Sequence, residues 1–486
     1  MLSLKKINQS DYEKKQAGKI EKEIPFFITI ITLLATSGFG PYTMLQKVKE
    51  INLLPVIRAE TVKILKRIDM LGVDPLTALN ESKDKPSSKA LGEFLSGYVS
   101  AIQSGGNVVN YLKTKMASAF ERFENMEKQS VEKVNGIIHA WLTIQIVVLA
   151  VFILIAAVGS NPMNSGGGKP AEPPYMLLMF APIMSVVFMK LVQNLVSSNI
   201  PEIKVKEIIK FAVPIVAIAI ILILSNVFSS MHINPYILGI ALIIASIKPA
   251  LKFQKIYALN LDAESATPQI LRDITEARKA GMGPEKCIIR ACKRKDYKSF
   301  NKIANSIAGR LEWGVSMNNL FEVLQKEIKN FQVLITFRIL FEIVTSGGGN
   351  VTTLDSLADT SERVHNIQKN KRESLKPYVI VGFMLITVTG FTTLMTIDSF
   401  ATISEQKSLG KPDPNAINYA PFIEFVSLAV VAQAWLAGLF IGKVTNGAYS
   451  GGFMLSIMLT AITLVAIAII QLHLFSINSL FGSSPS

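Results

Sequence analysis

Residues 25–41 read PFFITIITLLATSGFGP, and residues 268–284 read PQILRDITEARKAGMGP. A proline opens and closes both segments, and Gly38 of the first stands opposite Gly281 of the second. The shift between the two segments is about 243 positions. Self-similarity at a fixed shift indicates a duplicated structural unit, so the chain is expected to contain the same unit twice.

The correspondence continues downstream of both segments. LKRIDMLGVDPLTAL matches IAGRLEWGVSMNNLF, and VSAIQSGGNVVNYL matches FEIVTSGGGNVTTL, with glycines again opposite one another. Glycine reaches positive φ without strain, so these glycines are interpreted as helix C-caps and tight turns between helices. The structural turns predicted in this way are Gly38, Gly72, Gly105, Gly106, Gly281, Gly314, Gly347 and Gly348.

Apolar residues inside each copy follow helical spacing. They stand at i, i+4, i+8 and i+11 in one copy and at i, i+3, i+4 and i+7 in the other. These residues are Leu91, Leu95, Val99 and Ile102, and Phe337, Leu340, Phe341 and Val344. Each copy is therefore predicted to be an antiparallel bundle of about five or six helices, and the fold class is predicted to be all-α.

The composition favours a membrane protein. Half of the 486 residues are hydrophobic and only 18% are charged. Seven mostly apolar stretches of roughly 18–23 residues are long enough to cross ~30 Å of hydrocarbon. They run over 137–158, 175–194, 211–229, 233–251, 377–398, 420–442 and 453–475.

The apolar run 24–36 is a separate case, because its 13 or so residues are short for a membrane span. Its counterpart in the second copy carries Arg272, Asp273 and Glu276. A helix with such a counterpart is predicted to belong to the soluble bundle and not to the membrane.

The spans divide the chain into four parts. Soluble helical domains are predicted at 1–135 and 252–376, four transmembrane helices at 136–251, and three at 377–486. An even number of crossings separates the two domains, so both are expected to face the same compartment.

Positive charge concentrates in the two domains. Residues 1–135 contain 20 Lys+Arg against 15 Asp+Glu, and residues 251–376 contain 21 against 14. Basic segments tend to stay on the cytoplasmic side of a membrane. We therefore expect a multi-pass plasma-membrane protein with its N-terminus and both domains in the cytoplasm and its C-terminus outside.

The sequence offers little catalytic chemistry. Cys287 and Cys292 lack the spacing of a zinc site, the four histidines are scattered, and no nucleotide motif is present, so no catalytic residue, metal or cofactor is expected. Lys190, Lys248 and Asp398 lie near the ends of predicted spans, whereas Glu424 and Gln433 stand inside the sixth span, Glu424 about one turn from its outer edge. An intramembrane role for Glu424 stays open.

One basic cluster is a candidate docking site. It contains Arg290, Lys293, Arg294, Lys295 and Lys298. Few aromatic residues interleave with these cations, so nucleic acid is not the expected partner. A patch that docks a protein and a simple solvated helix face are equally consistent with the pattern.

The sequence resembles the F-type inner-membrane platform of type II secretion and type IV pili, particularly the archaeal form found in archaella and archaeal pili. The resemblance covers essentially the whole chain. It lies in EIPFFITIITLLATSGFGP, in the paired SGGNV and SGGGNV segments, in the alternation of helical domains with spans, and in FIGKVTNGAYSGGFML. The extra spans favour an archaeal type, whereas archaellum, adhesive pilus and secretion pseudopilus stay open.

The resemblance implies a non-enzymatic platform for filament assembly. The expected partners are a cytoplasmic hexameric secretion ATPase, pilin-like or archaellin subunits, membrane lipid and a second copy of the chain in a homodimer. The alternative is a secondary transporter or channel with appended regulatory domains. A transporter would place polar, broken helices at the middle of the membrane, where these spans show little matching polarity.

Overall fold

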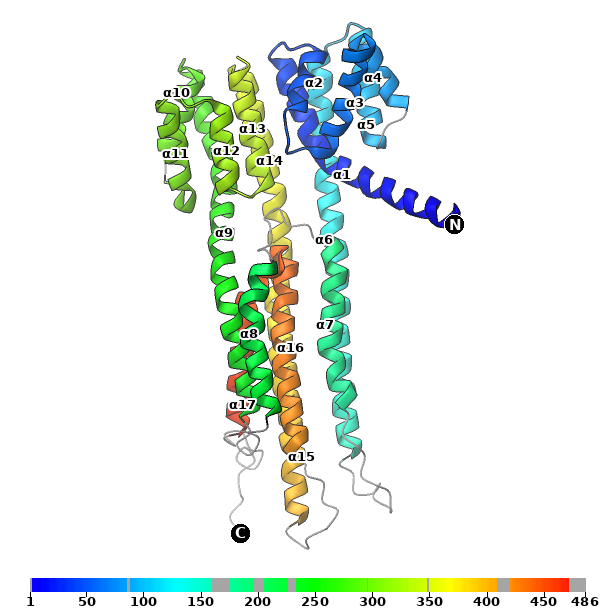
Figure 1. The fold of residues 1–486 in the computed structure, drawn as a ribbon, viewed down its shortest axis with the longest axis vertical. Helices are drawn as coiled ribbons and strands as arrows, with labels where there is room; N and C mark the ends of the chain where they lie inside the picture. Colours follow the sequence, from blue (N-terminus) through cyan, green and yellow to red (C-terminus); the bar gives the residue numbers. More distant parts are fainter. Residues whose placement is uncertain are drawn as a thin grey trace. The chain divides into compact units, whose positions relative to one another are not determined.

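The computed structural model describes residues 2–84, 88–159, 175–195, 205–225, 233–294, 296–347, 349–408 and 420–471. Every regular element in these ranges is a helix. The chain divides into two compact units (Figure 1). Unit 1 comprises Met1–Gln129 and Tyr257–Asn370, and unit 2 comprises Ser130–Ile256 and Lys371–Ser486.

The first repeat contributes six helices, the last of which continues into unit 2. They are α1 (Leu2–Thr36), α2 (Pro41–Lys49), α3 (Pro55–Leu71), α4 (Pro75–Asp84), α5 (Lys89–Gln103) and α6 (Val108–Gly159). Proline stands at the first position of α2, α3 and α4, where its missing N–H costs no helical hydrogen bond.

The second repeat follows the same order with one short helix added. Its elements are α9 (Asn234–Lys279), α10 (Pro284–Arg294), the 3₁₀ helix η3 (Lys298–Phe300), α11 (Asn301–Glu312), α12 (Met317–Glu327), α13 (Phe331–Thr345) and α14 (Val351–Leu375). Both repeats thus fold as six-helix bundles, and they lie together in unit 1 around a shared apolar core.

The paired glycines form the turns that join these helices. Six of them have positive φ, between 65° and 87°: Gly38, Gly72, Gly105, Gly281, Gly314 and Gly347. At four of the six turns, the N–H after the turn glycine bonds to the carbonyl five residues back, which is the Schellman closure. Gly106 donates the bond of this kind that follows Gly105, and Gly348 lies outside the described residues.

The apolar run at the end of α1 belongs to the core of unit 1. Residues 24–34 are buried on every side of the helix, and Phe26, Phe27 and Leu33 all belong to the same apolar cluster as the helices of both repeats. Tertiary packing, and not lipid, covers this helix.

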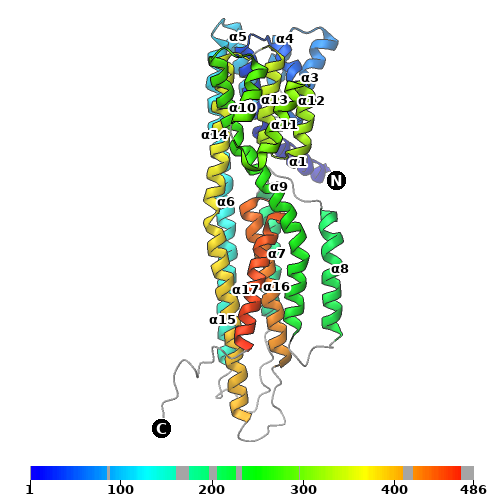
Figure 2. The same ribbon diagram turned by 90° about the vertical axis from the view of Figure 1, so that its left-hand side faces the viewer.

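Unit 2 is built around one central helix. Its remaining elements are α7 (Tyr175–Leu195), α8 (Val205–Leu224), α15 (Pro377–Ser408), α16 (Ala420–Asn446), the 3₁₀ helix η4 (Tyr449–Gly452) and α17 (Phe453–Gln471). Helix α16 packs against α7, α15 and α17 (Figure 2).

Five helical stretches in the described residues are long and apolar enough to cross a membrane. They are Val108–Leu154, Asn234–Lys279, Val351–Thr396, Glu424–Asn446 and Tyr449–Ile470. Met179–Gln193 and Lys210–Leu224 are apolar but shorter, and they overlap the second and third of the seven predicted spans. The structure therefore supports a multi-pass membrane protein without confirming the count of seven.

The chain passes between the units three times, and each passage lies inside a helix. The boundaries fall at 129/130 in α6, at 256/257 in α9 and at 370/371 in α14. No turn or loop separates the units at any of these places.

Candidate functional site

The basic cluster on α10 is partly neutralised within its own repeat. Lys293 Nζ lies 2.6 Å from Glu312 Oε1, and Arg294 bonds Asp273 Oδ1 at 2.7 Å. The Asp273 side chain is only 6% exposed, so Arg294 neutralises a buried carboxylate. These two cations therefore hold the fold of the second repeat, whatever else they contact.

The rest of the cluster is more open. Arg290 is exposed, and its Nη1 lies 3.3 Å from the sulfur of Met282. Lys298 is exposed, and among the described non-glycine residues it alone has a positive φ, of 53°. Lys295 lies outside the described residues. Among the cations of this cluster that the structure describes, Arg290 and Lys298 are best placed to meet a partner.

The cysteines are buried in the same repeat. Burial raises the pKa of Cys292 to about 12, so its thiolate is scarce at neutral pH. Burial also raises the pKa of Cys287. In the ranges described, no group of three His, Cys, Asp or Glu side chains is arranged to hold a metal ion.

Aromatic packing joins the two repeats. The Phe26 ring of α1 meets Phe331 of α13 edge-on, with ring centroids 5.3 Å apart, and it also meets Phe120 and Phe123 of α6. Elsewhere between the repeats, Lys47 Nζ of α2 lies 2.9 Å from Glu342 Oε1 of α13, whose side chain is buried. An apolar core and an ion pair therefore both join the repeats.

A second contact joins equivalent helices of the repeats. The Arg363 guanidinium of α14 lies over the Phe120 ring of α6 at 6.0 Å, and it donates to the Ala117 carbonyl at 3.4 Å. Unit 1 is thus built from both repeats. Two of the three helices that lead from it into unit 2, α6 and α14, contact each other through these residues.

A polar cluster lies inside unit 2, among predominantly apolar helices. Ser185 Oγ of α7 lies 3.2 Å from Trp141 Nε1 and 3.4 Å from Gln145 Nε2 of α6, and 3.1 Å from Gln433 Nε2 of α16. Three helices that are far apart in the sequence therefore share one hydroxyl. Hydrogen bonds of this kind join helices in lipid, where water is not available as a partner.

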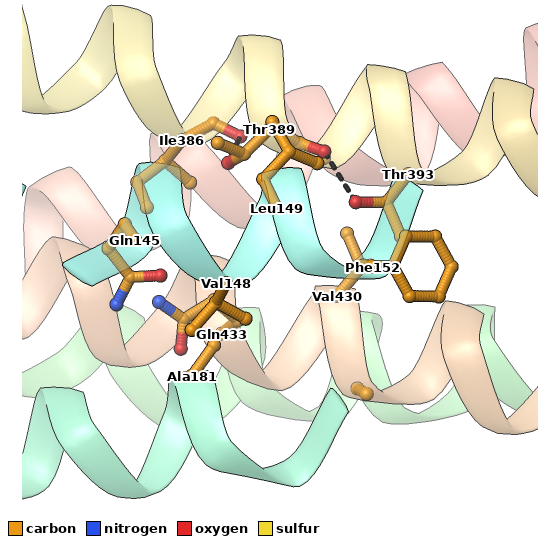
Figure 3. A pocket seen from close by; sticks show the side chains of 12 residues that line it. Gln145, Val148, Leu149, Phe152, Ala181, Ile386, Thr389, Thr393, Val430 and Gln433 are labelled. Carbon is orange, nitrogen blue, oxygen red and sulfur yellow. Dashed lines mark hydrogen bonds between the residues drawn. The ribbon is translucent and has the colours of Figure 1, made fainter. Parts of the chain in front are cut away.

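A small cavity adjoins this polar cluster. It has a volume of about 60 Å³ and is lined by α6, α7, α15 and α16. Figure 3 shows the side-chain amides of Gln145 and Gln433 directed toward one another at one side, with Val148, Leu149 and Phe152 making the apolar wall. The sequence singled out Gln433 but not Ser185 or Gln145, because only the packing of the three helices shows that these side chains meet.

Glu424 has a partner in the structure. The amide of Asn234, at the start of α9, donates to its carboxylate, and the other amide atom, Asn234 Oδ1, is buried without a hydrogen bond. Since the pair ties the starts of α9 and α16, a structural role accounts for Glu424.

Close glycine packing joins α16 to η4 and α17. A Cβ atom on Gly438 or Gly442 would collide with the backbone of the partner segment, at Ser456 and Gly452. Small residues at these positions allow two helices to approach closely in a membrane. This explains the glycines of FIGKVTNGAYSGGFML as packing residues.

Comparison with known proteins identifies the family. The family model described as "Type II secretion system (T2SS), protein F" matches residues 26–158 and 270–397, which together make up more than half of the chain. Each matched segment begins within the first helix of a repeat and extends into the span that follows it.

A curated relative is an uncharacterized protein of the archaeon Methanocaldococcus jannaschii. It is 21% identical over 404 residues, which cover 76% of this chain and 66% of the relative. The match thus spans slightly less than two thirds of the relative's length. No solved structure matches this chain. On the family match, supported by two bundles of the same helix order, the chain belongs to the type II secretion system protein F family.

Proposed function

We propose that this chain is the membrane platform on which a pilus-like filament is assembled, and that it couples a cytoplasmic secretion ATPase to the insertion of pilin-like subunits. Membership of the protein F family supports a platform role, as opposed to an enzymatic one. The similarity to an archaeal protein favours an archaellum or an archaeal pilus as the filament.

The observation that carries the proposal is the continuity of α6, α9 and α14 across the boundaries between the two units. A hydrogen-bonded helix transmits a displacement that a flexible linker would absorb. A partner that moves unit 1 therefore moves three helices of unit 2, which is what mechanical coupling to subunits in the bilayer requires.

The proposed topology has seven spans. Unit 1 and the N-terminus lie in the cytoplasm and the C-terminus lies outside, on the charge argument given above. In a variant without Cys287 and Cys292, single cysteines within 160–170 or 405–415 should be labelled from outside intact cells. Cysteines replacing the exposed Lys66 or Lys326 should be protected. External labelling at Lys66 or Lys326 would reverse the orientation.

Coupling through the helices can be tested by local substitution. A pair of glycines is placed at 129–130, 256–257 and 370–371 together, and the matched control has alanine pairs at the same places. Because glycine loosens a helix by roughly 1 kcal/mol per residue relative to alanine, the glycine variant should insert and bind the ATPase but assemble few filaments. Electron microscopy of cells that lack the native gene counts the filaments. Equal assembly by both variants would contradict the proposal.

The ATPase is proposed to meet the open cations Arg290 of α10 and Lys298 of η3. Arg290→Glu with Lys298→Glu should weaken binding and reduce its dependence on salt, since exposed charges are screened over ~8 Å at physiological ionic strength. Lys293→Glu with Arg294→Glu is the informative contrast, because it breaks the ion pairs to Glu312 and Asp273 and should lower the melting temperature.

A further inference from the structure

Exposed apolar side chains are rare in unit 1 and occur at one repeated place. Among the side chains of unit 1 that the structure describes, which begin at Ala17, the large apolar ones left exposed are Met70, Leu71 and Trp313, at 78%, 73% and 88%. Leu71 and Trp313 are equivalent, since each directly precedes the turn glycine at the end of the third helix of its repeat, Gly72 or Gly314.

The fold does not need these side chains. Ile68 and Val73 in the first repeat, and Val315 in the second, pack against the core at the same helix ends. The turns close through bonds from Gly72 N to the Ile68 carbonyl and from Val315 N to the Arg310 carbonyl. Since single exposed apolar residues are common but matched ones are not, their recurrence in both repeats calls for a partner.

Trp313 also differs from the other two tryptophans of the chain. Trp141 and Trp435 lie in unit 2, and their indole N–H groups donate to Ser185 and Ser246. Tryptophan is the residue most enriched among side chains that carry binding energy at protein interfaces. An indole that is almost fully exposed is therefore suited to anchor a partner.

Cations accompany the apolar residues at both helix ends. Arg310 stands three residues before Trp313, and the exposed Lys66 stands four before Met70, so that each lies on the same helix face. Arg67, three before Met70, is paired with Glu81 at 3.2 Å. Lys293 of the basic helix α10 is paired with Glu312, the neighbour of Trp313. The end of α11 is thus continuous with the basic face of α10.

We propose that the ends of α3 and α11 are two equivalent anchor points, at which Met70–Leu71 and Trp313 enter apolar pockets edged with carboxylates on a protein that repeats the same pocket. This inference rests on the proposed function, because a homo-oligomeric ATPase is such a protein. Lys66 and Arg310 meet the carboxylates, while Arg290 and Lys298 steer the encounter.

A membrane surface is the less favoured occupant. Stable binding to anionic lipid takes clusters of about four to eight cations or a broad amphipathic face. The end of α3 offers a short apolar anchor with Lys66 and Arg67 beside it. At the end of α11, two of the neighbouring cations, Lys293 and Arg294, are already neutralised by Glu312 and Asp273. This chemistry suits a pocket with a defined edge.

The test measures binding of the purified cognate ATPase to the full-length chain in nanodiscs of neutral lipid. Three variants are compared with wild type: Met70→Ser with Leu71→Ser, Trp313→Ser, and all three changes together. Each single-site variant should bind at least about tenfold more weakly, and the combined variant at least about a hundredfold, because two linked anchors reinforce one another. Asn319→Ser, an exposed polar change on α12, is the matched control and should leave affinity unchanged.

Two further measurements separate the possible results. Circular dichroism melting should be the same for all variants, since the changed side chains are exposed. Acrylamide should quench the fluorescence of Trp313 in the free chain and quench it less in the complex. Wild-type affinity in the combined variant would overturn this inference alone. No ATPase binding by the wild-type chain would overturn the proposed coupling and the inference with it. Binding of phosphatidylglycerol vesicles that is lost in the combined variant would assign the anchors to the membrane and also overturn the inference.

Discussion

The two repeats fold alike but expose different helices. In the first repeat, residues 24–34 of α1 are buried on all sides, whereas the equivalent part of α9 exposes Gln269, Arg272 and Glu276. The fifth helix shows the opposite pattern, because α13 of the second repeat is buried on nearly every side while α5 of the first exposes Lys89 and Glu93. The helices buried on nearly every side, α1 and α13, meet each other across the two repeats.

This difference explains why the two repeats associate with each other and do not favour the addition of a third. The contact between α1 and α13 is apolar, and the corresponding outer faces of α5 and α9 are polar. Burying these polar faces against a third repeat would gain little free energy from the hydrophobic effect. The apolar run of α1 is the first repeat's half of an interface inside one chain.

The joint at the start of the fifth helix also differs between the repeats. In the second, Asn330 caps α13 through Gln332 N at 2.9 Å and donates to the buried Glu264 at 3.0 Å, and Glu264 lies 3.4 Å from His365 Nδ1. In the first repeat, Ser88 caps α5 by accepting a hydrogen bond from Leu91 N. A groove of about 310 Å³ lies beside α1, α5 and α6. At this joint the second repeat has a buried network of Asn330, Glu264 and His365, whereas the first repeat has an open groove.

The largest expected effect comes from breaking the interface between the repeats. Phe26→Ala should lower the free energy of unfolding by about 3–5 kcal/mol, because it opens a cavity among Phe120, Phe123 and Phe331. The equivalent change in the second repeat, Gln269→Ala, affects an exposed side chain and should stay within about 0.5 kcal/mol. Urea unfolding in detergent measures both, and similar losses would show that the repeats are symmetric after all.

The polar joint should give the next largest effect. Asn330→Ser puts the residue of the first repeat into the second, and it should cost about 1–3 kcal/mol because Glu264 loses a buried donor. The reciprocal change, Ser88→Asn, keeps a capping residue and should alter stability by less than about 1 kcal/mol. The same urea titration compares them, and a larger cost for the reciprocal change would contradict this account of the joint.

Substitutions in the equivalent turns of the two repeats should have equal effects on stability. Gly105→Ala and Gly347→Ala each put a Cβ on a residue with positive φ, which costs roughly 1–2 kcal/mol. Their costs should be equal, because both turns have the same conformation. Gly309→Ala, inside α11 with open space around the added Cβ, should instead stabilise by up to about 1 kcal/mol. Thermal melting ranks the three, and unequal costs at Gly105 and Gly347 would mean that the turns have diverged.

The smallest effect is a pH dependence found in the first repeat. Glu23 caps the start of α3 by accepting from Ile57 N at 2.8 Å, and its counterpart in the second repeat is Ala266. Burial raises the pKa of Glu23, so this carboxyl adds stability at low pH that is lost as the pH rises through its raised pKa. Glu23→Gln should remove that part of the pH dependence, with Ala266→Ser as a control that leaves it in place. An unchanged difference in melting temperature between acid and neutral pH would contradict this assignment.

Some of the fold followed from local chemistry. The six turn glycines with positive φ stand where the repeat alignment predicted turns, because backbone conformation at a helix end depends on the residue itself. The apolar run of α1 was predicted to be a bundle helix from its charged counterpart, and it lies in the core of unit 1. The long apolar stretches likewise predicted a membrane protein, because the thickness of the bilayer sets the length of a span.

Other features depended on which side chains meet in space. Charge in the sequence could not show that Lys293 and Arg294 are held by Glu312 and Asp273, since those partners belong to other helices. The shared hydroxyl of Ser185 and the asymmetric contact of α1 with α13 also join residues that are distant in the chain. The amino-acid sequence by itself determined the duplicated helices, their turns and their apolar spans, because these arise from interactions between near neighbours. Only tertiary packing decided which helices are covered, which cations stay open and which apolar side chains stay exposed, because each of these depends on residues brought together from far apart in the chain.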